Sequence, residues 1–213
     1  MSPSAEPPRD CPLCPRLVAY RRLNRDQHPD WWNGPAPSFG DPDARLLIVG
    51  LAPGRMGANR TGRPFTGDFA GVLLYATLIK LGFATGRYEA RPDDGLALVD
   101  CMITNAVRCA PPGNKPETAE EAACRPFLAA QIAALPRLKV IVTLGDVARR
   151  NLMRALGLKA SAGLSGHGAR TQAAGLTVIN SYHCSRLNTN TGRLTPAMFE
   201  AVFETAKAEL AAG

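Results

Sequence analysis

The sequence predicts an α/β fold, a three-layer α/β/α sandwich around a central, mostly parallel four-stranded sheet. Four short apolar runs are as continuously hydrophobic as strands that are buried on both faces of a parallel sheet. Segments of helical length and spacing alternate with these runs, which is typical of parallel sheets covered on both faces. The 213 residues, 46% of them apolar and 20% charged, fit a flexible N-terminal tip, 1–10, and a single domain, 11–213.

The first 44 residues contain little regular pattern. Residues 1–10 are rich in proline and polar side chains, which favours a flexible tip. We expect a short helix after Cys11-Pro-Leu-Cys14, and then irregular structure packed by Trp31 and Trp32. The regular pattern begins with the apolar run 45–51, the first strand, which Pro53-Gly54 ends.

Helices and strands then alternate to the end of the chain. We expect strands at 96–107, 139–145 and 176–183, and helices at 69–83, 117–135, 146–158 and 195–212. Thr118 and Glu121 form a capping-box pattern, and Pro126 should bend or split the helix that they begin. Thr195 and Pro196 are typical of the N-cap and first position of the last helix.

Charge and apolar patterning limit the classes of partner. Lys and Arg number 25 against 18 Asp and Glu, and this excess of +7 favours a polyanion such as nucleic acid. No apolar run approaches the roughly 20 residues of a membrane helix, and the first residues lack the apolar region of a secretory signal. We therefore expect no membrane partner and a reducing, cytoplasmic location, where six cysteines indicate a metal or catalysis before disulfides.

Ligands of parallel sheets bind beyond the carboxyl ends of the strands. This rule selects four loops: 51–68, 106–118, 145–150 and 183–194. The segment 50–68 is rich in glycine and contains Arg55, Arg60 and Arg63, which suits close approach to phosphates. It matches neither a dinucleotide-binding fingerprint nor a Walker A loop, and a long solvated turn is the alternative.

The loop 183–194 begins with a histidine at the end of an apolar strand. A single histidine is more often structural, but polar and basic residues surround His183 without apolar periodicity, which favours a functional role. Leu187 is the isolated apolar residue among them. It is either a packing contact or a wedge that enters between DNA bases.

The six cysteines fall into two groups. Cys11, Cys14, Cys109 and Cys124 together match the four thiolates of either a [4Fe–4S] cluster or a structural zinc site. Cys101 lies inside an apolar strand, so we expect a packed core thiol. Cys184 follows His183 and is either inert or part of the site.

Three long motifs stand at the ends of the predicted strands: GLAPG with NRTGRPFTGD (50–54 and 59–68), ITNAVRCAPPGNKP (103–116) and HCSRLNTNTGRLTP (183–196). Together they resemble the type-b, or family 5, uracil-DNA glycosylases of bacteria and archaea. The resemblance runs from Cys11 to the last helix and implies the uracil-DNA glycosylase fold. The related type-a (family 4) enzymes carry Glu where this chain has Leu51. Both branches bind a [4Fe–4S] cluster, so the resemblance implies iron–sulfur at Cys11, Cys14, Cys109 and Cys124.

The resemblance also implies roles for individual residues. Such enzymes flip the damaged base out of DNA before cleaving its bond to the sugar. Phe65 matches the ring that stacks on uracil, and the Asn105 amide matches the group that pairs with its edge. His183 matches the donor to uracil O2, which stabilises the charge of the departing base.

Asp68 is the acid nearest to these groups in the first motif. It could stabilise the sugar cation and orient water, or serve as the N-cap of the following helix, and both roles can hold together. Further substrate contacts are expected from Gly50, Leu51, Asn114 and Asn188. The residues expected to contact DNA are Arg55, Arg60, Arg63, Ser185, Arg186, Leu187 and Arg193, with Leu187 as the wedge.

The function expected from the resemblance is a DNA glycosylase that releases uracil and other deaminated or damaged bases and so initiates base excision repair. We expect it to be a monomer. We also expect it to be monofunctional, because a bifunctional enzyme attacks with an amine, and Lys115 is the sole amine side chain in the three motif loops. Double- or single-stranded DNA is the expected partner. The alternative is an iron–sulfur-stapled DNA-binding module without catalysis, which would not need His183, Asn105 and Asp68. One departure is Cys184, where related enzymes have proline, so the entry to this loop is less rigid.

Overall fold

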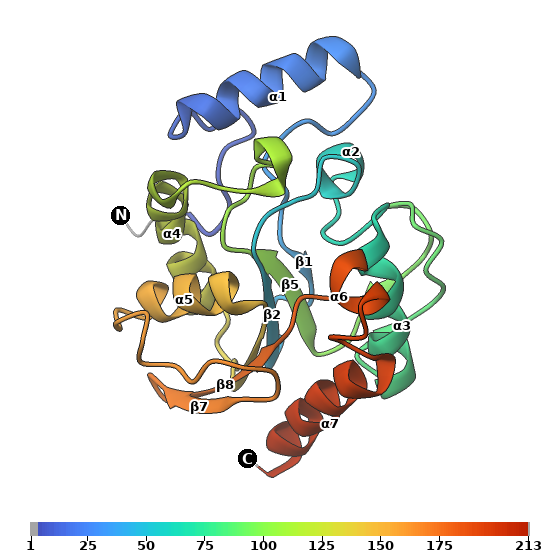
Figure 1. Cartoon of the computed structure of the whole chain (residues 1–213), viewed down its shortest axis with the longest axis vertical. Helices are drawn as coiled ribbons and strands as arrows, with labels where there is room; N and C mark the ends of the chain where they lie inside the picture. Colours follow the sequence, from blue (N-terminus) through green and yellow to red (C-terminus); the bar gives the residue numbers. More distant parts are fainter. Residues whose placement is uncertain (1–3, 213) are drawn as a thin grey trace.

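The computed structural model describes residues 4–212, which contain a central six-stranded sheet with the strand order β1-β5-β2-β6-β8-β7 (Figure 1). The four inner strands are parallel: β5 (Cys101–Asn105), β2 (Leu46–Gly50), β6 (Val140–Leu144) and β8 (Leu176–Ser181). The edge strands, β1 (Phe39–Gly40) and β7 (Arg170–Ala173), are antiparallel. The predicted α/β class is confirmed, but the count of four strands was wrong. The short β1 and the polar β7 have no apolar run to reveal them.

Two helices cover each face of the sheet. Alternate residues of β2 point to opposite faces. Leu46 and Ile48 belong to the core under α3 (Phe69–Leu81) and α7 (Pro196–Ala212). Leu47 and Val49 belong to the core under α4 (Thr118–Ala133) and α5 (Asp146–Ala155). Both faces of the inner strands are therefore buried, which explains their continuous apolar sequences.

Several element boundaries differ from those predicted. The run 96–107 contains two strands, because β4 (Ala97–Leu98) leaves the main sheet and pairs with β3 (Ala84–Thr85). The capping box of α4 uses Glu117 and Glu120, each one residue before the predicted pair Thr118 and Glu121. Pro126 does not split α4, in which Leu128 of the next turn is buried against the sheet. Short helical segments lie within the predicted loops: α2 (Ala58–Thr61), η1 (Pro112–Asn114) and α6 (Arg186–Asn190).

The N-terminal region forms a separate layer at one end of the sheet. The helix expected after Cys14 is α1 (Pro15–Gln27), which lies beyond α2 and α4 in Figure 1. Residues 1–3 of the predicted flexible tip lie outside the described residues. Arg108, only 1% exposed, donates hydrogen bonds to the Glu6 carboxylate (3.2 Å) and to the Ala5 carbonyl (3.0 Å). These bonds hold the segment before α1 on the loop that follows β5. No helix of residues 4–212 is long and apolar enough to cross a membrane.

A buried ion pair ties the loop after β2 to the segment 84–100. The guanidinium of Arg63 donates to both carboxylate oxygens of Asp94, at 2.8 and 2.7 Å. The two side chains are 5% and 0% exposed. This hydrogen bonding holds the pKa of Asp94 well below its usual range. The structure therefore gives Arg63 an internal partner instead of the expected contact with DNA.

We expect Arg63→Met to lower the free energy of unfolding by about 3–5 kcal/mol, because the Asp94 charge stays buried without its partner. Urea unfolding measures the loss. Arg91→Met is the matched control, since Arg91 pairs with Glu89 at an exposed site where such pairs contribute about 0–1 kcal/mol. An equal loss of unfolding free energy in the two variants would show that the buried pair does not stabilise the fold more than the exposed pair does.

Candidate active site

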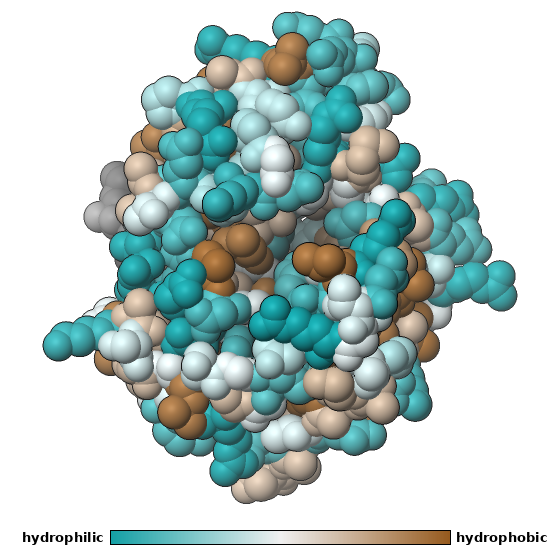
Figure 2. Space-filling model, in the orientation of Figure 1, coloured by the Kyte–Doolittle hydropathy of each residue, from teal (hydrophilic) through white to brown (hydrophobic). Residues whose placement is uncertain are grey.

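A cavity of about 380 Å³ lies beyond the carboxyl ends of β2, β5 and β8. This volume is typical of small-ligand sites. The face drawn in Figure 2 is hollowed near its centre, with hydrophobic residues beside the hollow and mainly hydrophilic residues farther out. The cavity is lined by Leu51, Ala52, Pro53, Gly54, Phe65, Asp68, Phe69, Ala70, Asn105, Asn114, His183, Ser185 and Arg186.

Ten of the thirteen lining residues come from three of the four loops that the sequence selected, and the other three are Asn105 at the end of β5 and Phe69 and Ala70 at the start of α3. Eight of the predicted site residues are among them: Leu51, Phe65, Asp68, Asn105, Asn114, His183, Ser185 and Arg186. The loop 145–150 contributes none, although Gly145 lies behind the His183 side chain. Five lining residues were missed. Of these, Phe69 could have been found from the sequence, because it is an aromatic residue directly after Asp68. In the structure it lies at the start of α3 and is 38% exposed.

The back wall of the cavity depends on a glycine. Gly50 ends β2 directly opposite Asn105, which ends β5. A Cβ atom at Gly50 would lie 2.4 Å from Oδ1 of Asn105 and 2.8 Å from the Phe65 ring. The missing side chain thus lets an amide and an aromatic ring meet at one point. Gly50, predicted to contact substrate, shapes this corner without lining it.

Phe65 has an unusual backbone. Its φ angle is 53°, in the left-handed region that non-glycine residues rarely adopt. The ring is buried and lies 6.1 Å from the His183 ring, with an angle of 34° between the planes. The two rings thus form adjoining walls of the same cavity.

His183 follows the last strand of the parallel core. The Asn188 amide donates a hydrogen bond to the His183 carbonyl at 2.8 Å, which fixes the backbone at this position. Burial lowers the pKa of the His183 imidazole, so the ring is neutral near pH 7 and offers one N–H donor. Asn188, predicted to bind substrate, is absent from the cavity lining and instead holds His183.

The two carboxylate oxygens of Asp68 have different surroundings. Oδ1 accepts the Gly71 N–H at 3.2 Å and caps α3. Oδ2 faces Gly54 and Gly57, where a Cβ atom would lie 3.4 and 2.3 Å from it. Burial raises the pKa of Asp68 above that of an ordinary aspartate. The structure therefore combines both predicted positions of Asp68, at a helix start and in the cavity wall.

Basic and apolar side chains surround the cavity mouth. Ser185 caps α6, and the Arg186 guanidinium lies 5.1 Å above the Phe69 ring. Leu187 is 72% exposed, as a wedge requires. The other predicted DNA contacts lie farther out: Arg193 stacks on Tyr182, Arg55 donates to Asn24, and Arg60 donates to the Met56 carbonyl.

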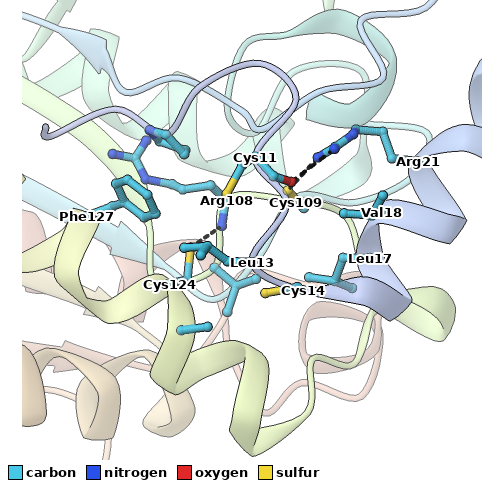
Figure 3. A pocket seen from close by; sticks show the side chains of 13 residues that line it. Cys11, Leu13, Cys14, Leu17, Val18, Arg21, Arg108, Cys109, Cys124 and Phe127 are labelled. Atoms are coloured by element: carbon cyan, nitrogen blue, oxygen red, sulfur yellow. Dashed lines mark hydrogen bonds between the residues drawn. The ribbon is translucent and has the colours of Figure 1, made fainter.

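Four cysteines line a second, smaller pocket between α1, α4 and the loop after β5 (Figure 3). They are Cys11, Cys14, Cys109 and Cys124. Apolar side chains such as Leu17 and Phe127 surround them. Among residues 4–212 no three ligating side chains lie close enough together to bind a single metal ion. The four thiols line one pocket, and four thiolates are the donor set of either an iron–sulfur cluster or a structural zinc ion.

Nitrogen donors point at two of these sulfurs. Arg21 Nη1 lies 3.7 Å from Cys109 Sγ, and the Arg108 N–H lies 3.3 Å from Cys124 Sγ. Such hydrogen bonds are a usual feature around iron–sulfur clusters. The remaining two cysteines lie elsewhere. Cys101 is buried in the core, as predicted, and Cys184 is fully buried and lines neither pocket.

Known proteins share these features. A profile described as "Uracil DNA glycosylase superfamily" matches residues 37–207. A "Type-5 uracil-DNA glycosylase" of Thermus thermophilus is 46% identical over 92% of this chain and 92% of its own length. One from Pyrobaculum aerophilum is 41% identical over 94% of this chain and 89% of its own length. A "Type-4 uracil-DNA glycosylase" of the same archaeon is 34% identical over 71% of this chain and 64% of its own length.

These matches confirm the family that the three motifs predicted. The profile spans all six strands of the main sheet, and both type-5 relatives match more than nine-tenths of the chain. The chain belongs to the uracil DNA glycosylase superfamily.

Proposed function

We propose that the protein is a monofunctional uracil-DNA glycosylase. It hydrolyses the N-glycosidic bond of uracil, or of another deaminated base, in a nucleotide flipped out of DNA, and so initiates base excision repair. The observation that carries the proposal is the convergence of Phe65, Asn105, His183 and Asp68 on one cavity of about 380 Å³. The names of its type-5 relatives support the same activity.

The back wall recognises the base. The Phe65 ring offers a face for stacking, and the Asn105 amide offers one acceptor and two donors. Uracil presents the complementary N3–H donor and O4 acceptor on one edge. Because Gly50 has no side chain, the ring and the amide lie close together, so that both can contact one flat ligand.

His183 stabilises the departing base. When the bond between C1′ and N1 breaks, its electron pair leaves with uracil, and negative charge spreads to O2. A neutral imidazole with an N–H aimed at O2 lowers the energy of that charge, in the manner of an oxyanion hole. Burial keeps the imidazole neutral, and Asn188 fixes the backbone that carries it.

Asp68 acts on the sugar side. It is the sole carboxylate among the described lining residues, since Leu51 supplies none. Its ionised form stabilises the positive charge that develops at C1′. A water molecule then bonds to C1′ and gives a proton to Asp68, which leaves an abasic site and the uracil anion; the anion takes up a proton from solvent, and Asp68 returns its own to solvent.

The cavity mouth fits DNA. Arg186 is positioned for a phosphate, and the exposed Leu187 can fill the gap that the flipped nucleotide leaves. A DNA-binding module without catalysis would not need a buried amide, imidazole and carboxylate in one cavity. The monomeric state and the cytosolic location stay predictions.

We further propose that the four-cysteine pocket holds a [4Fe–4S] cluster, ligated by Cys11, Cys14, Cys109 and Cys124. When bound, the cluster supplies cross-links between segments that are distant in the sequence, and the base-release chemistry proceeds without it. Its ligands come from the segment before α1, from the loop after β5 and from α4. A structural role follows, because these ligands would join segments that are distant in the sequence, alongside polar contacts such as Arg108 with Glu6 and Arg16 with Glu120.

We expect His183→Ala to release uracil from a labelled duplex about 10²–10³-fold more slowly than the wild type, the usual cost of removing one oxyanion-hole donor. Alkaline cleavage at the abasic site measures the product. His28→Ala is the matched control, because His28 stacks on Trp31 away from the cavity. A wild type that releases neither uracil nor hypoxanthine nor xanthine would refute the enzyme and favour the DNA-binding module.

The pH dependence of base release should reveal Asp68. Burial raises its pKa, so the carboxylate forms only at a higher pH than for an ordinary aspartate, and the rate rises as pH passes through that raised value. Asp68→Asn should lose this rise and about 10²–10⁴-fold of the rate. Asparagine caps helices as well as aspartate does, so the thermal midpoint should change little. An unchanged pH profile in Asp68→Asn would exclude the catalytic role.

Cys109→Ala should lose bound iron, acid-labile sulfide and visible absorbance together, and should unfold at a lower denaturant concentration than the wild type. Cys101→Ala is the control, because this buried thiol lies outside the four-cysteine pocket. It should keep its iron and sulfide. Full iron content in Cys109→Ala would remove this residue from the proposed ligand set.

A further inference from the structure

We propose that Tyr88 is a positioning residue for Phe65, which fixes the backbone of the base-stacking ring through its hydroxyl. Tyr88 lies outside the cavity, on the segment between β3 and β4. The inference rests on the proposed function, since it gives Tyr88 a part in holding the flipped base.

The backbone at Phe65 needs external support. A φ of 53° costs a bulky residue roughly 1–3 kcal/mol relative to ordinary conformations, so it persists only where neighbours impose it. A relaxed backbone would turn the ring away from Asn105 and His183. The groups that bond the peptides around Phe65 therefore determine where the base can stack.

Two tyrosine hydroxyls bond this strained segment. Tyr75 of α3 donates to the Pro64 carbonyl at 2.6 Å. Tyr88 donates to the Phe65 carbonyl at 3.1 Å and accepts the Gly67 N–H at 3.4 Å. The Tyr88 hydroxyl thus bonds both the carbonyl of the strained Phe65 and the N–H of Gly67, two residues farther along.

The fit around this carbonyl is tight. A Cβ atom at Gly71 would lie 1.8 Å from the Phe65 oxygen and 2.5 Å from the Tyr88 hydroxyl. The start of α3 at Gly71 therefore packs closely against the Phe65 carbonyl. The Gly71 backbone and the Tyr88 hydroxyl together restrict the rotation of the Phe65 peptide.

The segment that carries Tyr88 is itself anchored. Its ring packs 4.7 Å from the Tyr75 ring. Asp94 accepts the backbone N–H groups of Glu89 and Leu96 and pairs with Arg63. Arg63 also donates to the Thr66 hydroxyl at 2.7 Å. The buried ion pair therefore holds both the strained loop and the tyrosine that braces it.

The test removes only the hydroxyl. Tyr88→Phe keeps the ring and should lower the single-turnover rate of uracil release about tenfold, the factor that one net hydrogen bond corresponds to. Binding to undamaged duplex should stay within twofold, because no DNA contact is lost. Tyr20→Phe on α1 is the matched control and should keep the wild-type rate.

Coupling separates positioning from general destabilisation. If Tyr88 acts through the ring, Tyr88→Phe should change the rate less than twofold in a Phe65→Ala background. A tenfold loss in both backgrounds, or a wild-type rate in the single variant, would overturn the proposal. A wild type without glycosylase activity would instead overturn the proposed function.

Amide exchange tests the brace independently of catalysis. Among the described residues, the Tyr88 hydroxyl is the acceptor for the Gly67 N–H. Tyr88→Phe should therefore speed hydrogen exchange at Gly67, whereas exchange within β2 should stay unchanged. Equal protection of Gly67 in both proteins would show that the hydroxyl does not hold this loop, whatever the enzyme's activity.

Discussion

The parallel register of β2 and β5 is the constraint on which the site depends. It places Gly50 directly opposite Asn105 at the edge where both strands end. Since glycine leaves this corner free, the Asn105 amide and the Phe65 ring approach each other across it. The rest of the cavity is arranged around that corner: His183 arrives from β8, and Asp68 from the start of α3. The pairing register of these two strands therefore sets the geometry of the cavity.

The side chains that line the cavity are fixed by hydrogen bonds to groups that do not line it. Asn188 holds the His183 carbonyl, the Gly71 N–H holds one oxygen of Asp68, and the Tyr88 hydroxyl bonds the Phe65 carbonyl. These contacts are to backbone carbonyls or to one carboxylate oxygen, so the Phe65 ring, the His183 imidazole and the second Asp68 oxygen stay free of them. Groups fixed in advance need little rearrangement when charge develops, and this preorganisation is the main source of electrostatic catalysis.

The sequence predicted the parts of the fold that carry local patterns. The four inner strands are continuous apolar runs, and the motif residues at their ends meet in one cavity, as the topology requires. The edge strands β1 and β7 carry no such pattern. Arg63 resembled its basic neighbours, because its partner Asp94 lies 31 residues farther along the chain. Asn188 shows the same limit, since only the folded loop turns its amide back toward His183.

The loops around the cavity have separate anchors. Arg63 and Asp94 hold the loop after β2, Asn188 holds the entry to α6, and the buried Arg108 holds the loop after β5. Each of these side-chain anchors bonds a different loop, so a substitution at one of them acts first on its own wall. Backbone bonds from the Ala106 N–H to the Gly50 carbonyl and from the Val107 N–H to the Leu51 carbonyl also join the loops after β2 and β5. In evolutionary terms, separate anchors let the shape of the cavity change one substitution at a time.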